Sequence, residues 1–165
     1  MDFFRKWDGS IVDELDQLFT ESLKSVDNKY YQYTKEIVDD SVTGTIFRVI
    51  PTVKNAPMIL FHTFQESNII DVEIGKGFKV EVFLPKSLSG HRKVFTKLRD
   101  WIQAALQGAL VEDITYIDAS EYKIEAFLNV NNRIYTSSTR NISELFEDTD
   151  KENRTIRKLA YESYD

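Results

Sequence analysis

The sequence contains no cysteine and only two histidines, His62 and His91. The absence of cysteine excludes a disulfide scaffold, a zinc finger and a catalytic thiol. Two histidines are also too few soft ligands for a typical structural zinc site. No apolar run approaches the roughly 18 residues that span a bilayer, and the N-terminal segment lacks a basic stretch followed by an apolar one. We therefore expect a cytoplasmic protein that has no cofactor and no membrane contact.

Length and composition predict one domain over residues 1–165. The chain has 165 residues, of which 42% are hydrophobic. A chain of this length buries roughly 70% of its unfolded surface, which is enough for a core without covalent cross-links. The sequence contains no internal repeat, no low-complexity segment and no linker.

Charge is unevenly distributed along the chain. The formal net charge is −6, and both the first and the last part of the sequence are acidic. A basic island lies between them, with a single acidic residue, Glu81, among the basic side chains of Lys76, Lys79, Lys86, Arg92, Lys93, Lys97 and Arg99. The negative total disfavours direct nucleic-acid binding, because the long-range field repels polyanions. The island is interpreted either as internal neutralisation of acidic neighbours or as a contact for an anion or for a second copy of the chain.

Hydrophobic periodicity predicts three helices. Apolar residues recur at helical spacing over residues 10–26, where Ser10 and Asp13 form the pattern of a capping box. A second helix is expected over residues 91–107 and should end at Gly108. A third helical region is expected to begin at Asn141 and to continue to Ala160, with an interruption in its polar middle.

Alternating patterns predict about eight strands. Residues 30–38, 43–50 and 58–64 are the first three, and the last of these is apolar on both faces. Strands at 110–117, 122–130 and 133–138 follow the second helix, and Asn131-Asn132 is expected to form a two-residue turn because asparagine tolerates positive φ.

The stretch from Asn68 to Leu84 predicts a hairpin with a defined register. A three-residue loop, Gly75-Lys76-Gly77, would pair Ile74 with Phe78 and place the apolar residues of both strands on one face. Gly77 is expected to take the left-handed conformation. The same register places Glu73 opposite Lys79, and Asp71 opposite Glu81.

The element order defines an α+β fold. Helix, five strands, helix, two or three strands and helix predict a mainly antiparallel sheet of about six to eight strands. The three helices are expected to form a single layer on one face of that sheet.

Few residues form a pattern typical of catalysis. Asp71, Glu73 and Glu81 lie close on one strand face, where they would either bind a divalent cation or form an ordinary solvent face. Glu121-Tyr122-Lys123 resembles the Glu-x-Lys element of metal-dependent nucleases, but the tripeptide is common, so we interpret it as a strand surface. No Gly-x-Ser-x-Gly, Walker loop or dinucleotide fingerprint occurs. We assign no catalytic and no metal-binding residue.

The leading hypothesis is a non-enzymatic protein-binding domain. At the level of composition, a small acidic chain rich in aromatics resembles immunity proteins and antitoxins, which mask a basic partner by electrostatic steering and a few buried anchors. We expect the partner-binding residues to be Tyr31, Tyr33, Asp39, Asp40, Glu112 and Asp113. Within the basic island, we expect His91, Arg92, Lys93 and Lys97 to contact an anion or a second copy.

Three alternatives remain open. The order of helices and strands is similar to that of small secretion-type chaperones, which bind an extended segment of a client and are commonly dimers. A structural component of a phage particle would also lack catalytic motifs. The third alternative is a cation-dependent enzyme or ligand-binding domain that uses Asp71, Glu73 and Glu81.

Overall fold

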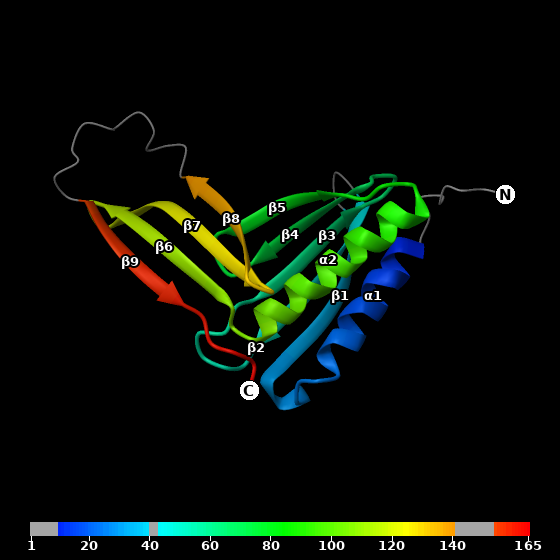
Figure 1. The fold of residues 1–165 in the computed structure, drawn as a ribbon, viewed down its shortest axis with the longest axis horizontal. Coiled ribbons are helices and arrows are strands. Elements are labelled where there is room, and N and C mark those ends of the chain that lie inside the picture. The colour runs from blue at the N-terminus through cyan, green and yellow to red at the C-terminus, as the bar shows by residue number, and fades with distance from the viewer. Residues whose placement is uncertain (1–9, 40–42, 141–153) are drawn as a thin grey trace.

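The structure is a computed structural model that describes residues 10–39, 43–140 and 154–165. These residues form two helices, a short 3-10 turn and nine strands (Figure 1). In chain order the elements are α1 (Ser10–Leu23), η1 (Asn28–Tyr30), β1 (Tyr31–Asp39), β2 (Thr43–Pro51), β3 (Ile59–Phe64), β4 (Ile69–Ile74), β5 (Phe78–Phe83), α2 (Leu88–Leu106), β6 (Leu110–Ile117), β7 (Ser120–Val130), β8 (Arg133–Arg140) and β9 (Arg154–Ala160).

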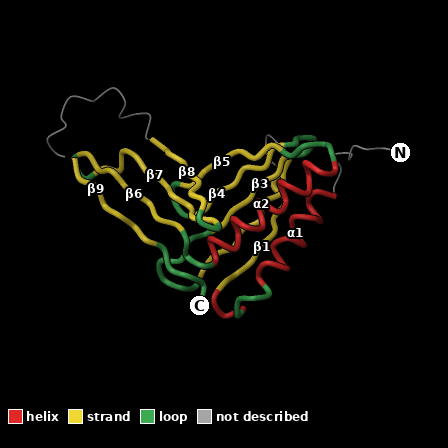
Figure 2. The backbone as a smooth tube through the Cα atoms, viewed as in Figure 1, coloured by secondary structure: helices red, strands yellow, loops and turns green. Residues whose placement is uncertain are grey.

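The strands form two antiparallel sheets. The first has the order β1-β2-β3-β4-β5, so each strand pairs with its neighbour in sequence. The second has the order β8-β7-β6-β9. Both helices lie on one face of the first sheet, and the second sheet diverges from the β5 side of the first (Figure 2). The α+β class is confirmed, whereas the expected single sheet is replaced by two.

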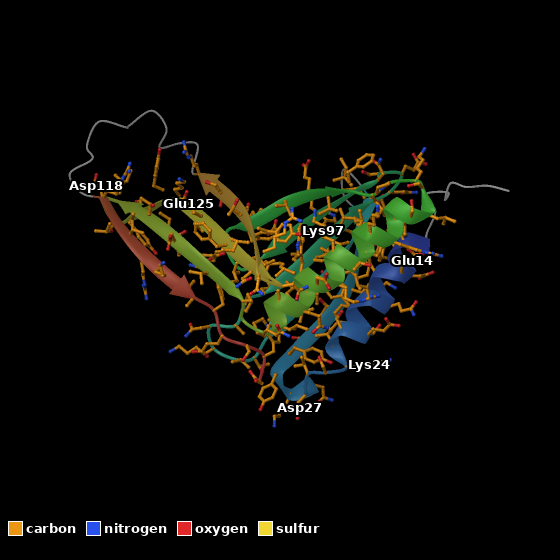
Figure 3. All side chains as sticks on the ribbon, viewed as in Figure 1. Glu14, Lys24, Asp27, Lys97, Asp118 and Glu125 are labelled. Atoms are coloured by element: carbon orange, nitrogen blue, oxygen red, sulfur yellow. The ribbon has the colours of Figure 1, made fainter. Side chains whose placement is uncertain are left out.

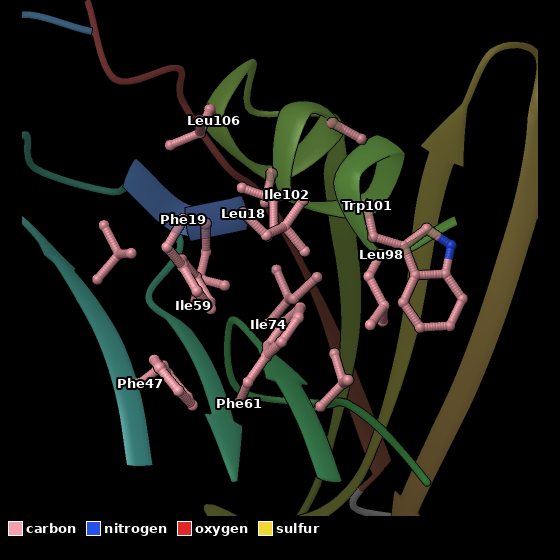
Figure 4. Packing of buried hydrophobic residues seen from close by; sticks show 14 of the residues in the cluster. Leu18, Phe19, Phe47, Ile59, Phe61, Ile74, Leu98, Trp101, Ile102 and Leu106 are labelled. Atoms are coloured by element: carbon pink, nitrogen blue, oxygen red, sulfur yellow. The ribbon is translucent and has the colours of Figure 1, made fainter. Parts of the chain in front are cut away.

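One hydrophobic core joins the helices to both sheets. The ring of Phe19 on α1 stacks on Tyr33 and Phe47 and meets Phe61 edge-on. Figure 4 shows Trp101 on α2 beside Leu98. Its ring contacts Phe78 of the first sheet and Tyr135 of the second, each in an edge-to-face arrangement. Trp101 therefore lies where the two sheets and α2 meet.

The β4–β5 hairpin has the register that its sequence predicts. Ile74 pairs with Phe78, Glu73 with Lys79, and Asp71 with Glu81. The positive φ falls on Gly75 (+66°), however, and not on Gly77 as expected. A Cβ on Gly77 would lie 2.2 Å from Cγ2 of Ile124, so this glycine is required by its close approach to the second sheet.

The two asparagines at 131 and 132 form the predicted turn. Their φ angles are 50° and 65°, and Val130 pairs directly with Arg133. This is the backbone twist that favours asparagine in two-residue hairpin loops.

The expected third helix is wrong where the structure describes it. Residues 154–160 form β9, which pairs with β6 along its length. The remainder, residues 141–153, lies outside the described residues. Without β9, β6 would present an unpaired row of backbone groups, and the ladder satisfies them. The weak helical spacing of Ile156, Leu159 and Ala160 does not outweigh that pairing.

The second helix begins earlier than its apolar pattern indicates. The hydroxyl of Ser87 accepts a hydrogen bond from the N–H of Gly90 at 3.2 Å, and the helix starts at Leu88. It ends as expected before Gly108, which has a φ of +71°. Serine at the N-cap and glycine after the last turn are the usual boundary residues.

Candidate functional site

The two tyrosines expected at a partner surface both pack against the core. The hydroxyl of Tyr33 donates to Oδ1 of Asp16 at 2.7 Å, and its ring stacks on Phe19. Burial, followed by this hydrogen bond, raises the pKa of Tyr33 above its usual value. Tyr31 is partly buried against the same core. Tyr33 therefore fixes β1 to α1, and its expected role as a partner contact stays a prediction.

The acidic pairs expected at that surface do not form one patch. Asp39 is exposed at the end of β1 and accepts a hydrogen bond from Thr43, whereas Asp40 lies outside the described residues. Asp113 lies 3.7 Å from the ammonium of Lys158 on β9. Glu112 is 0% exposed, which argues against the expected partner contact at this residue.

Glu112 instead holds the β4–β5 loop against the second sheet. Its Oε1 accepts from the N–H groups of Lys76 at 2.9 Å and Gly77 at 2.6 Å. Its Oε2 accepts from the hydroxyl of Tyr161 at 2.8 Å. A Cβ on Gly75 would meet Leu110, Glu112 and Tyr161 within 2.9 Å, so the loop fits only because it lacks side chains there. Burial and the bond to Glu112 raise the pKa of Tyr161, which keeps the phenol a donor.

The basic island divides into a paired half and a solvent-facing half. On the hairpin, Lys76 lies 3.5 Å from Glu121 and Lys79 lies 3.8 Å from Glu73. His91 is buried, lies 2.7 Å from Glu14 and stacks on Phe95, which argues against its expected contact with an anion or a second copy. The exposed cations of α2 are Arg92, Lys93, Lys97 and Arg99. They form no ion pair with any residue that the structure describes.

The first sheet has an outer face, which is the side turned away from the two helices. Phe47, Phe61 and Val72 point to the core, so the residues that alternate with them point outward. The register aligns one row of outward residues across all five strands, in the order Glu36, Ile46, His62, Asp71 and Glu81. In the adjacent row of outward positions, Gly44 pairs with Phe64 and Ile69 pairs with Phe83.

Two carboxylates oppose each other in this outer face. Asp71 and Glu81 are direct cross-strand partners, and Asp71 also pairs with His62 on β3. Partial burial, followed by the charge of Glu81, raises the pKa of Asp71; His62 lowers it, and the charge of Glu73 raises it by a smaller amount. Phe83, one row away, is 63% exposed. The outer face thus combines unneutralised negative charge with exposed aromatic surface.

The raised pKa of Asp71 predicts a pH-dependent effect on stability. Below its ordinary value of 3.8 the group is protonated in both the folded and the unfolded state, so it contributes nothing. As the pH rises, the Asp71 carboxyl ionises less readily in the folded state than in the unfolded state, so the folded state loses stability relative to the unfolded one. Asp71→Asn is therefore expected to raise the melting temperature at about pH 7 and to leave it unchanged at about pH 3. The matched variant Glu73→Gln, which breaks an ion pair, should give no such gain; equal gains from both would contradict the assignment.

The described residues do not favour a metal-dependent site. Within residues 10–39, 43–140 and 154–165, no three histidine or carboxylate side chains are arranged to hold a metal ion. Glu73 is paired with Lys79, which leaves Asp71 and Glu81 as the nearest acidic pair. In the Glu-x-Lys element, Glu121 pairs with Lys76, and Lys123 pairs with Glu125 at 2.7 Å, so neither converges on a shared centre.

A cavity of about 410 Å³ lies where the start of α1 meets the ends of β2 and β3. Its walls are mainly apolar and include Ile11, Ile37 and Phe64. Glu66 is the only titratable side chain among the described lining residues, so this cavity has no acid–base pair.

Comparisons with protein-family models, curated proteins and solved structures found no match. Among the described residues, no helix combines the length and apolar character needed to cross a membrane. The fold defines an α+β protein with two antiparallel sheets.

Proposed function

We propose that this chain is a non-enzymatic protein-binding domain that masks a basic partner, in the manner of an inhibitor, immunity protein or antitoxin. The single observation that supports this most directly is the opposition of Asp71 and Glu81 beside the exposed Phe83 on the outer face. The proposal moves the binding surface from the residues expected by sequence to this face.

The electrostatics of the outer face fit a cationic partner. Like charges directly opposite each other on neighbouring strands destabilise a sheet. A lysine or arginine of a partner placed between Asp71 and Glu81 would turn that repulsion into two attractions. The net charge of −6 would steer a basic protein toward the chain and raise its association rate.

The exposed ring of Phe83 supplies the apolar part of such an interface. Phe83 is 63% exposed and lies in the row next to Asp71 and Glu81. Burial of a large apolar side chain relative to its exposed state contributes roughly 1.5–3 kcal/mol. Aromatic anchors are enriched at the centres of interfaces, and polar residues form the surrounding rim.

A double charge reversal tests this proposal. Asp71→Lys with Glu81→Lys keeps one like-charge pair across the strands, so the folding penalty is retained while the sign presented to the partner changes. We expect the basic partner captured by the wild-type chain from native lysate at low salt, then purified, to bind the variant at least about tenfold more weakly in calorimetry. Wild-type binding should also weaken as salt rises.

The matched control carries the same charge change elsewhere. Asp13→Lys with Glu21→Lys alters two exposed carboxylates of α1 and should bind the partner with an affinity close to that of the wild type. A partner that is acidic, or one that binds both double variants equally well, would refute the outer face as the binding surface.

A further inference from the structure

The second sheet and α2 enclose a groove along the free edge of β5. It has a volume of about 460 Å³. Its apolar floor includes Val80, Val82 and Val94, and its walls are formed by Trp101 and Tyr135. Val80 and Val82 place this groove on the helix side of the first sheet, and Glu81 and Phe83 also line it, so it adjoins the outer face at the edge of β5.

The edge of β5 is only partly occupied. Ser137 of β8 reaches across to Lys79, where its hydroxyl accepts from the N–H at 3.1 Å and donates to the C=O at 2.9 Å. The hydroxyl of Ser137 thereby satisfies the two backbone groups of Lys79 that a neighbouring strand would otherwise bind. Because backbone groups alternate along a strand, those of Glu81 and Phe83 point to the same side as those of Lys79. In the described sheet β5 is a terminal strand, so these groups have no strand partner.

The wall of the groove carries positive charge. Lys97 lies on α2 (Figure 3). Its ammonium is 4.9 Å from the ring centre of Trp101 and 5.6 Å from that of Tyr135. The guanidinium of Arg133 lies 4.9 Å from the ring centre of Tyr135. These cations are held by aromatic faces and form no ion pair with the described residues. An incoming carboxylate would meet Lys97 without displacing an internal partner.

We propose that this groove binds an extended segment of another protein, which adds to β5 as an extra strand and directs a carboxylate at Lys97. Main-chain hydrogen bonds to Glu81 and Phe83 would provide the affinity common to such strand additions. Apolar side chains on either side of the carboxylate would pack on Val80 and Val82. This inference does not rest on the proposed function, because it uses the backbone edge of β5 and the cation of Lys97 and requires the opposite partner charge.

A library of random peptides of about seven residues, displayed on phage and selected on the full chain, tests the inference. We expect enriched sequences with an acidic residue flanked at two-residue spacing by apolar ones. A synthetic peptide of that sequence should slow hydrogen exchange at the amides of Glu81 and Phe83. The same peptide methylated at alternate backbone nitrogens should not bind, because it lacks the donors that a strand requires.

Two variants of α2 isolate the role of Lys97. Lys97→Glu should weaken the selected peptide by at least about tenfold, whereas Arg99→Glu, an equal charge change two positions along the helix, should have little effect. An equal loss of peptide affinity in both variants would show that only the net charge of the chain matters, and it would overturn the proposal. So would selected peptides without a carboxylate, protection confined to other amides, or failure of the selection to enrich any sequence. Protection of Glu81 and Phe83 that rises with protein concentration in the absence of peptide would assign the groove to a second copy and also overturn it.

Discussion

Glu112→Ala is expected to lower the free energy of unfolding by about 2–4 kcal/mol, because it removes the carboxylate that accepts from three donors, of which the N–H of Gly77 is buried. The donors are the N–H groups of Lys76 and Gly77 and the hydroxyl of Tyr161. These bonds connect the β4–β5 loop, β6 and the C-terminal segment, so their loss should loosen the contact between the two sheets. For a chain of this size the change corresponds to a fall in melting temperature of roughly 5–15 °C.

Two further variants test whether the loss of stability comes from the hydrogen bonds of Glu112. Glu112→Gln keeps a carbonyl oxygen that can accept from the loop, so it should cost only about 1 kcal/mol. Asp113→Ala removes the neighbouring carboxylate, whose ion-pair partner Lys158 is 70% exposed, and should cost less than about 1 kcal/mol. If thermal unfolding shows the same stability for Glu112→Ala and Asp113→Ala, the structural role of Glu112 is wrong.

Gly108→Ala is expected to be comparably destabilising, by about 2–4 kcal/mol. Gly108 has a φ of +71°, which L side chains rarely adopt. Its added Cβ would also lie 2.5 Å from the carbonyl carbon of Glu162 and 2.6 Å from the nitrogen of Ser163. Both neighbours are backbone atoms of the C-terminal segment, which is tied to α2 by the hydrogen bond from Tyr164 N–H to the Leu106 carbonyl at 2.9 Å. Neither can move without disturbing that packing.

Asn132→Ala serves as a control for Gly108→Ala, because it measures the cost of positive φ without a steric clash. Asn132 has a φ of 65° in an exposed turn, so its replacement should cost only the strain, about 1 kcal/mol. The excess cost of Gly108→Ala in chemical denaturation then measures the close approach of the C-terminal segment. Equal costs would show that this segment moves away freely.

Features set by neighbouring residues could be predicted from sequence. The Asn68–Leu84 hairpin and its register follow from alternation on both sides of a short loop, because a shift of one residue would turn the apolar face to solvent. That register also placed Asp71 opposite Glu81, which is half of the candidate site. The Asn131-Asn132 turn follows from the tolerance of asparagine for positive φ.

Features set by distant residues could not be predicted. Glu112 belongs to an alternating strand and carries a charge, so its pattern indicates an exposed position. Its burial is possible because distant donors satisfy both oxygens: the loop backbone donates to Oε1, and the hydroxyl of Tyr161 donates to Oε2. Tyr33 likewise has an unremarkable strand position until α1 brings Asp16 to its hydroxyl.

The sequence by itself determined the α+β class, most strands, two helices and the local turns, because periodicity and turn chemistry act over a few residues. Only the tertiary structure decided that the strands divide into two sheets, that residues 154–160 pair with β6, and that the basic island separates into paired and open halves. It also decided which charged residues face solvent. Burial and ladder pairing depend on segments that meet only after folding, and the free energy of satisfying buried polar groups outweighs weak local preference.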